Sequence, residues 1–302
     1  MVRFKSLLSY YSSKLHDLIK GKRMSRKVQI CPVGFEFDRV IKGVNEHSCN
    51  VIYLLRSVKK IRKEDHPNKR LIEIANTFVK KLEDHFNSTK ICMPIVRETN
   101  VVTLEKTIEE LCQIIKKEVE EEGTKEIWIN ISTSTKLFVS AAMYVAAFYP
   151  QIIHLFYLDA RHYTVNLLLD EGTKKEEITK KFQDKGISYE ENEESYKNIN
   201  VPSYTMELLK DIKKKVIVTL KRVIDANKVE MVSFKNLLKE LGEDVNDKKI
   251  KVRYGHHLSY LEKRNWIYDK PLYGREKQFG LTPEGRILGI IYTYLKEEEE
   301  IL

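Results

Sequence analysis

The sequence predicts an α/β fold, in which a mostly parallel, doubly wound sheet is followed by a separate, basic helical unit. Two observations lead to this prediction. From residue 28 onward, short apolar runs alternate with helical patterns, as in sheets built with right-handed crossovers. Residues 28–245 carry no net charge, whereas residues 246–290 carry +5 of the chain's total of +9. A length of 302 residues is sufficient for two such domains.

The elements of the sheet follow from hydrophobic patterning. The continuous apolar run Val51–Leu55 is typical of a buried parallel strand, and the alanine-rich stretch Lys136–Phe148 predicts a helix that packs against a sheet. We expect strands at Val28–Pro32, Val51–Leu55, Ile91–Val96, Glu126–Ile131, Ile152–Leu158 and Thr164–Leu169. We expect helices at Phe35–Val44, Asn68–Phe86, a stretch that ends near Gly123, and Lys136–Phe148.

Shifts in composition set the predicted boundaries. We divide the chain into a basic N-terminal extension (1–26), a sheet domain (27–185), a polar linker (186–203) and a C-terminal domain (204–302). Residues 1–27 carry +7, and their apolar residues recur at helical spacing. This pattern predicts a short amphipathic helix, and Met24 is an alternative start of the chain.

Composition also argues against several functions. No run approaches the roughly 18 apolar residues of a membrane-spanning helix, so we expect no integral membrane association. The four cysteines show no C-x-x-C pair and no histidine at ligand spacing, which predicts no metal site and a reducing, cytoplasmic location. The G-x-G-x-x-G and P-loop motifs are both absent from the sequence, so a dinucleotide cofactor is not expected.

The C-terminal domain has the element order of a winged helix-turn-helix. Helices are expected at about Thr205–Ala226, Phe234–Leu241 and Asp247–Arg264, followed by a hairpin with a basic tip and a last helix that Thr282 caps. The third helix and the wing carry the residues that we expect to contact double-stranded DNA, namely Lys248, Lys249, Lys251, Arg253, His257, Tyr260, Arg275 and Lys277. Winged helices also serve as docking modules, so DNA binding is one of two interpretations.

Two loops follow strands of the predicted sheet and carry donors suited to an anion. Gly34–Arg39 follows the first strand, where glycine permits close approach of a backbone. Asn130–Lys136 places hydroxyl groups and a lysine at the start of a helix. Ligands of doubly wound sheets bind at the carboxyl ends of the strands, so both loops are candidates for a phosphate site. Ordinary helix capping is the alternative explanation for the Ser/Thr run.

Val33–Arg39 and Asn130–Lys136, together with the domain order, resemble the CRISPR-associated Rossmann-fold (CARF) sensor domains. The likeness is to the archaeal CARF–winged-helix regulators and the related haloarchaeal transcriptional regulators, and it spans roughly residues 27–290. The resemblance implies a Rossmann-like domain, a homodimer, a role in CRISPR antiviral defence and a cyclic oligoadenylate, commonly the tetra-adenylate, across the two-fold axis. The ligand would be lined by Gly34, Phe35, Glu36, Asp38, Arg39, Ser132, Thr133, Ser134, Thr135 and Lys136.

We therefore expect a ligand-responsive transcriptional regulator that is not an enzyme. A second hypothesis is a ring nuclease that cleaves its own cyclic ligand, with Lys136 and Ser132 assisting attack by a ribose 2′-hydroxyl. No paired general acid and base is evident for that reaction, so we assign no catalytic residue. A third hypothesis is a nucleotide-sensing interaction module that does not bind DNA.

Overall fold

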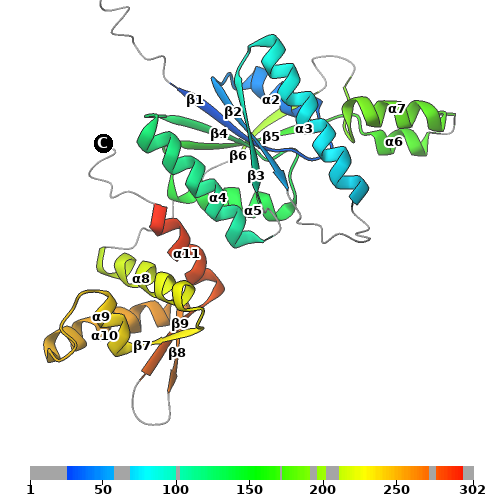
Figure 1. The fold of residues 1–302 in the computed structure, drawn as a ribbon. Coiled ribbons are helices and arrows are strands. Elements are labelled where there is room, and N and C mark those ends of the chain that lie inside the picture. The colour runs from blue at the N-terminus through cyan, green and yellow to red at the C-terminus, as the bar shows by residue number, and fades with distance from the viewer. Residues whose placement is uncertain are drawn as a thin grey trace, which may run out of the picture.

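The computed structural model describes residues 26–57, 69–99, 103–170, 172–190, 196–201, 211–271 and 277–294. The predicted amphipathic N-terminal helix and the wing residue Arg275 lie outside these ranges. The described chain forms an α/β sheet domain and a smaller C-terminal unit with a sheet of its own (Figure 1). Within these ranges, no helix has both the length and the apolar content needed to cross a membrane.

Six strands form the main sheet in the order β3-β2-β1-β4-β5-β6. The first five strands are mutually parallel, and β6 pairs antiparallel with β5 at the edge. The strand order reverses between β1 and β4, which is the position at which doubly wound sheets bind their ligands. The strands are β1 (Lys27–Pro32), β2 (Val51–Ser57), β3 (Met93–Thr99), β4 (Glu126–Asn130), β5 (Ile153–Ala160) and β6 (Tyr196–Val201).

Helices cover both faces of this sheet, as the alternating pattern predicts. One face is covered by α2 (Asp38–Glu46) and α3 (Lys69–Thr89), which share a hydrophobic cluster with inward residues of β1 and β2. The other face is covered by α4 (Leu104–Lys116), which continues into a π-helical turn η1 (Lys117–Glu121), and by α5 (Lys136–Phe148). The bounds of α5 match the sequence prediction.

The secondary structure of residues 164–201 differs from the sequence prediction in two places. Thr164–Leu169, expected as a strand, is the helix α6, and with α7 (Lys175–Lys185) it forms an arm at the carboxyl edge of the sheet (Figure 1). A six-residue apolar run does not by itself distinguish a strand from a helix, because each conformation can bury such a run. Residues 186–201, expected as a linker, contain β6, so the sheet domain extends at least to Val201.

The C-terminal unit contains the helices and the hairpin that the sequence predicts. Its strands form a small antiparallel sheet in the order β7-β9-β8. Side-chain caps define the starts of two helices: Ser233 accepts from the amide of Asn236, and Asp247 accepts from the amide of Lys249. The elements are α8 (Asp211–Asn227), β7 (Met231–Ser233), α9 (Phe234–Glu240), α10 (Lys248–Lys263), β8 (Ile267–Pro271), β9 (Lys277–Leu281) and α11 (Pro283–Tyr294).

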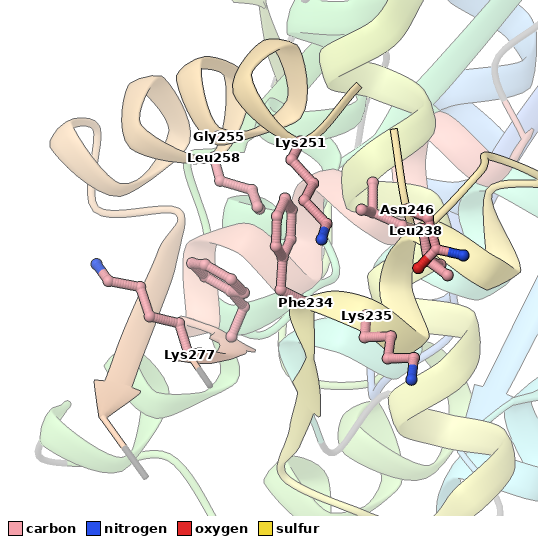
Figure 2. Close-up of a pocket in the computed structure, with 10 residues that line it drawn as sticks. Phe234, Lys235, Leu238, Asn246, Lys251, Gly255, Leu258 and Lys277 are labelled. Carbon is pink, nitrogen blue, oxygen red and sulfur yellow. The ribbon is translucent and has the colours of Figure 1, made fainter. Parts of the chain in front are cut away.

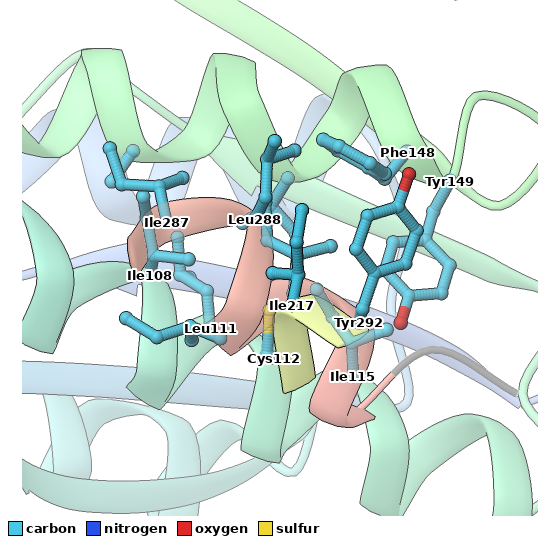
Figure 3. Packing of buried hydrophobic residues seen from close by; sticks show 14 of the residues in the cluster. Ile108, Leu111, Cys112, Ile115, Phe148, Tyr149, Ile217, Ile287, Leu288 and Tyr292 are labelled. Atoms are coloured by element: carbon cyan, nitrogen blue, oxygen red, sulfur yellow. The ribbon is translucent and has the colours of Figure 1, made fainter. Parts of the chain in front are cut away.

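Helix α11 joins the two units. It packs against both α4 and α8, and one hydrophobic cluster runs from the sheet through α4 and α5 into the C-terminal unit (Figure 3). The rings of Phe148 and Tyr292 meet edge to face with their centroids 5.6 Å apart. At the end of α11, Gln113 donates to the hydroxyl of Tyr294 at 3.1 Å. The C-terminal unit is therefore anchored to the sheet domain by buried apolar contact.

Candidate functional site

The loops that follow β1 and β4 meet at the point where the strand order reverses. A Cβ atom on Gly34 would lie 3.0 Å from the carbonyl oxygen of Thr133, so a larger residue at position 34 would push the two loops apart. The hydroxyl of Thr133 donates to the carbonyl oxygen of Pro32 at the end of β1. Gly34 thus permits the close backbone approach that the sequence predicted. In the structure, the group that approaches Gly34 is the carbonyl of Thr133 in the second loop.

The hydroxyl groups of the second loop bond within the protein. The amide of Leu158 donates to Ser132 Oγ at 2.8 Å, and Ser134 Oγ donates to the carbonyl oxygen of Ile131 at 2.7 Å. Thr135 caps α5 by accepting from the amide of Phe138 at 3.2 Å. The side chains of Thr135 and Lys136 are exposed at the start of α5. Capping explains part of the Ser/Thr run, and Lys136 is the side chain of this loop best placed to meet an anion.

Arg39 lies beneath the loops, with 2% of its surface exposed. Its Nη1 donates to the carbonyl oxygen of Ser132 at 2.8 Å and lies 3.0 Å from a carboxylate oxygen of Glu36. Its guanidinium also contacts the rings of Tyr157 and Tyr163. Burial disfavours the charged form, but Glu36 and the two tyrosines outweigh this effect and raise the pKa of Arg39. From the sequence we expect Arg39 to line the ligand site. In the structure, its side chain is buried behind the loop that contains Ser132.

The arm formed by α6 and α7 covers the first loop. The amide of Ile187 donates to the carbonyl oxygen of Phe35 at 2.6 Å, and the amide of Phe37 donates to that of Lys185 at 3.3 Å. Gly186 lies between them with φ 86°, and a Cβ atom there would lie 1.5 Å from the carbonyl oxygen of Phe35. This stretch of the arm therefore fits against Phe35–Phe37 only because residue 186 is glycine.

Carboxyl groups are enclosed where the arm meets the loop. Burial raises the pKa of Glu36, an effect that Arg39 and Ser188 partly offset. Burial likewise raises the pKa of Asp38 to about 6, although Lys185 lies 3.9 Å away. Gly34, Phe35, Glu36 and Asp38 are all partly buried, so the predicted site divides into a covered half around them and an open half at Thr135 and Lys136.

The third helix of the C-terminal unit presents a basic outer face. Tyr254, Leu258 and Leu261 of α10 point into the core, so residues half a turn away face outward. Lys248 and Lys249 are exposed on that outer side. The sequence pattern assigns Val252 and His256 to the inward side of this helix together with Leu258 and Leu261, and for the first two this is wrong, because both are exposed. Ser259, expected on the DNA-facing side, is also exposed.

The other residues predicted to contact DNA lie on the flanks of α10 or beyond it. Arg253 pairs with Glu243 at 3.1 Å, His257 lies against Tyr254, and the ring of Tyr260 lies beneath the ammonium group of Lys213. These three residues face α8 and the turn before α10. Lys251 and Lys277 lie on the opposite flank, where α10 meets β9.

A comparison with protein families matches part of the sheet domain. Residues 27–163 match the model of a protein family described as HFX_2341_N:-like, N-terminal. The matched stretch runs from the first residue of β1 past the end of β5. No curated protein matches the chain.

Several solved structures resemble the chain at low identity. A structure of Enterococcus italicus Csm6 bound to cyclic hexa-2′-fluoro-hexa-dAMP shares 12% identity at a TM-score of 0.36, covering 80% of this chain and 56% of that one. Can2 from Sulfobacillus thermosulfidooxidans, in complex with cyclic tetra-adenylate, shares 13% identity at a TM-score of 0.34, covering 90% of this chain and 63% of that one. The chain thus spans less than two thirds of the length of either protein.

Proposed function

We propose that this chain is a ligand-responsive DNA-binding regulator. Its sheet domain binds a cyclic oligoadenylate, and cyclic tetra-adenylate is the favoured ligand. Its C-terminal unit binds double-stranded DNA through the outer face of α10. Two copies associate so that one ligand contacts both, and occupancy of the ligand site changes the affinity for DNA.

The reversal of strand order between β1 and β4 carries the ligand half of the proposal. Doubly wound sheets bind ligands at this point, and here the start of α5 and the exposed Lys136 follow β4, one of the two strands concerned. The start of a 13-residue helix favours negative charge, and a lysine adds a full positive charge beside it. A ligand with several phosphates gains from each copy of this arrangement in a two-fold dimer.

The coupling between the two activities is supported by the buried contact at α11. Because α11 packs against α4, a shift of the helices that cover the sheet would move the C-terminal unit with it. In a dimer, such a movement would alter the spacing of the two α10 helices, which must match one turn of DNA or a multiple of it. Ligand can change DNA affinity in this way only if it binds the two arrangements unequally.

A binding measurement with radiolabelled cyclic tetra-adenylate tests the ligand site. We expect saturable binding at about one ligand per two chains, and at least a tenfold weaker affinity in Lys136→Glu. Lys125→Glu is the matched control, because Lys125 is also exposed but precedes β4, at the opposite edge of the sheet. Equal affinities of the two variants would contradict the assignment. Linear products after incubation would instead favour the ring nuclease.

Duplex binding tests the second half of the proposal. We expect a fluorescent 30-base-pair duplex of random sequence to bind at low salt and to lose affinity steeply as salt rises. The double variant Lys248→Glu, Lys249→Glu should abolish this binding, whereas Lys175→Glu, Lys180→Glu in the distant arm should retain it. If the α10 variant binds duplex as the wild type does, the C-terminal unit is an interaction module and the proposal is wrong.

A further inference from the structure

A pocket lies beside α10, between that helix, α9 and β9 (Figure 2). Its volume is about 430 Å³, within the range of pockets that hold small organic molecules. The lining residues are Phe234, Lys235, Leu238, Val245, Asn246, Lys251, Gly255, Leu258, Lys277 and Phe279. Leu238, Leu258 and Phe279 belong to the buried core, so the floor of the pocket is apolar.

The polar groups of the pocket carry one sign of charge. Every charged residue among those that line it is a lysine, with Lys235 from α9, Lys251 from α10 and Lys277 from β9. The three lysines come from different elements, and in Figure 2 the side chains of Lys235 and Lys277 extend in opposite directions. Lys277 also pairs with Asp269 at 2.6 Å, outside the lining. A cavity with an apolar floor and lysines on several sides is complementary to an anion that carries an apolar body.

Gly255 is a second, independent observation. It occupies the middle of the 16-residue helix α10, where glycine costs about 1 kcal/mol relative to alanine. Its backbone has no positive φ, and a Cβ atom there would meet nothing within 4 Å. Neither backbone conformation nor close packing therefore requires glycine at this position. Its effect is to leave space on the side of α10 that lines the pocket.

We propose that this pocket binds a small organic anion with an aromatic or branched apolar body, such as a carboxylate or a sulfonate. The apolar body lies on the floor formed by Phe234, Phe279 and Leu258, and the anionic group is held by the ammonium group of Lys251. Because Lys251 lines the pocket and is also among the residues predicted to contact DNA, the bound anion and DNA compete for it. That competition rests on the proposed DNA binding, whereas occupancy of the pocket does not.

Titration with 8-anilinonaphthalene-1-sulfonate tests occupancy, because its fluorescence rises in apolar surroundings. We expect saturable binding that weakens at least tenfold in Gly255→Leu, which fills the pocket, and severalfold in Lys251→Gln. Gly255→Leu should fold normally, since it replaces glycine inside a helix where space is open. Lys239→Leu is the matched control, because it removes an exposed lysine of α9 and adds an apolar group outside the pocket.

The uncharged analogue 1-anilinonaphthalene separates recognition of the anionic group from non-specific hydrophobic binding. We expect this analogue to bind at least tenfold more weakly than the sulfonate dye. Equal binding of the dye by wild type and Gly255→Leu, or of the two dyes by the wild type, would overturn the proposal. Saturating sulfonate should also raise the apparent Kd for duplex DNA severalfold, and an unchanged Kd would refute the competition. If the wild type binds no duplex at all, the proposed function is wrong, but the dye titration still shows whether the pocket binds an organic anion.

Discussion

The Nη1 atom of Arg39 donates a hydrogen bond to the main-chain carbonyl of Ser132 at 2.8 Å. The same guanidinium pairs with Glu36 and contacts Tyr163 at the start of the arm. One buried side chain therefore connects both strand-end loops with the arm. In the proposed site, Arg39 would act as a positioning residue, because it is buried and holds the loop that leads to Lys136.

Replacement of Arg39 by methionine should destabilise the protein by about 3–5 kcal/mol, because it leaves the carboxylate of Glu36 buried without its partner. Urea unfolding measures this change. The double variant Arg39→Met, Glu36→Gln should recover much of the stability, since no unpaired charge remains. Affinity for cyclic tetra-adenylate should recover in parallel with stability. A double variant that is stable yet fails to bind would mean that Arg39 or Glu36 contacts the ligand directly.

Gly186→Ala should detach the arm from the first loop. Alanine at φ 86° is strained, and its Cβ atom would overlap the carbonyl of Phe35. Hydrogen exchange of the Phe37 and Ile187 amides should accelerate at least tenfold, while exchange in the C-terminal unit stays unchanged. Gly172→Ala is a useful comparison, because that glycine also has positive φ but has open space around it. Equal exchange in both variants would argue against this role of Gly186.

Local sequence patterns predict the elements of this fold well. The apolar run Val51–Leu55 is β2, and the cap at Thr135 and the alanine-rich stretch after it give the bounds of α5. These features depend on periodicity and capping, which involve residues close together in the chain. The prediction of a strand at Thr164–Leu169 was wrong, because the conformation of this segment depends on the arm in which it lies rather than on its own apolar pattern.

The candidate site was harder to predict, because its geometry depends on long-range contacts. Arg39 was expected to face the ligand, and its burial follows from Ser132 and Tyr163, each more than 90 residues away in the chain. No local pattern indicates such partners. The position of Lys136 at the exposed start of α5 is predictable, since a lysine at the start of an apolar helix is placed by the helix itself. His256 was expected to face inward and is exposed, because Tyr254, Leu258 and Leu261 form the buried side of α10.

Glu118 should make stability depend on acid pH. It is fully buried and accepts hydrogen bonds from Arg26, Tyr53 and Thr124. Burial alone would raise the pKa of Glu118, but these three donors outweigh it and hold the pKa below its usual value. The carboxylate therefore contributes stability above the pKa of the unfolded chain, and this contribution is lost as pH falls through the lower folded pKa.

Glu118→Gln should remove that pH dependence. Urea unfolding at pH 7 and at successively lower pH should show a free-energy difference between wild type and variant that shrinks as the pH falls. Glu121→Gln, an exposed neighbour in the same π-helical turn, should follow the wild type at every pH. A constant difference between wild type and Glu118→Gln would show that the residue contributes through packing alone.

The exposed apolar residues of α6 should contribute to the interface of the proposed dimer. Val165, Leu168 and Leu169 are 53%, 62% and 80% exposed on one short helix at the carboxyl edge of the sheet. Leu168→Glu, Leu169→Glu should shift the chain toward monomer in light-scattering chromatography, because charge at a buried apolar contact is costly. Val229→Glu, an exposed apolar residue of the C-terminal unit, should leave the oligomeric state unchanged. A dimer that survives the double change would have its interface elsewhere.

The shared core at α11 should make the two units unfold together. The chain contains two tryptophans, Trp128 in β4 and Trp266 before β8, so Trp128→Phe and Trp266→Phe each leave one reporter in a different unit. Both reporters should give the same urea midpoint. Leu288→Ala in α11 removes buried apolar contact next to α4, and should cost about 2–5 kcal/mol and shift both midpoints equally. If Leu288→Ala shifts only the Trp266 transition, the contact at α11 is too weak to transmit ligand binding from the sheet domain to α10.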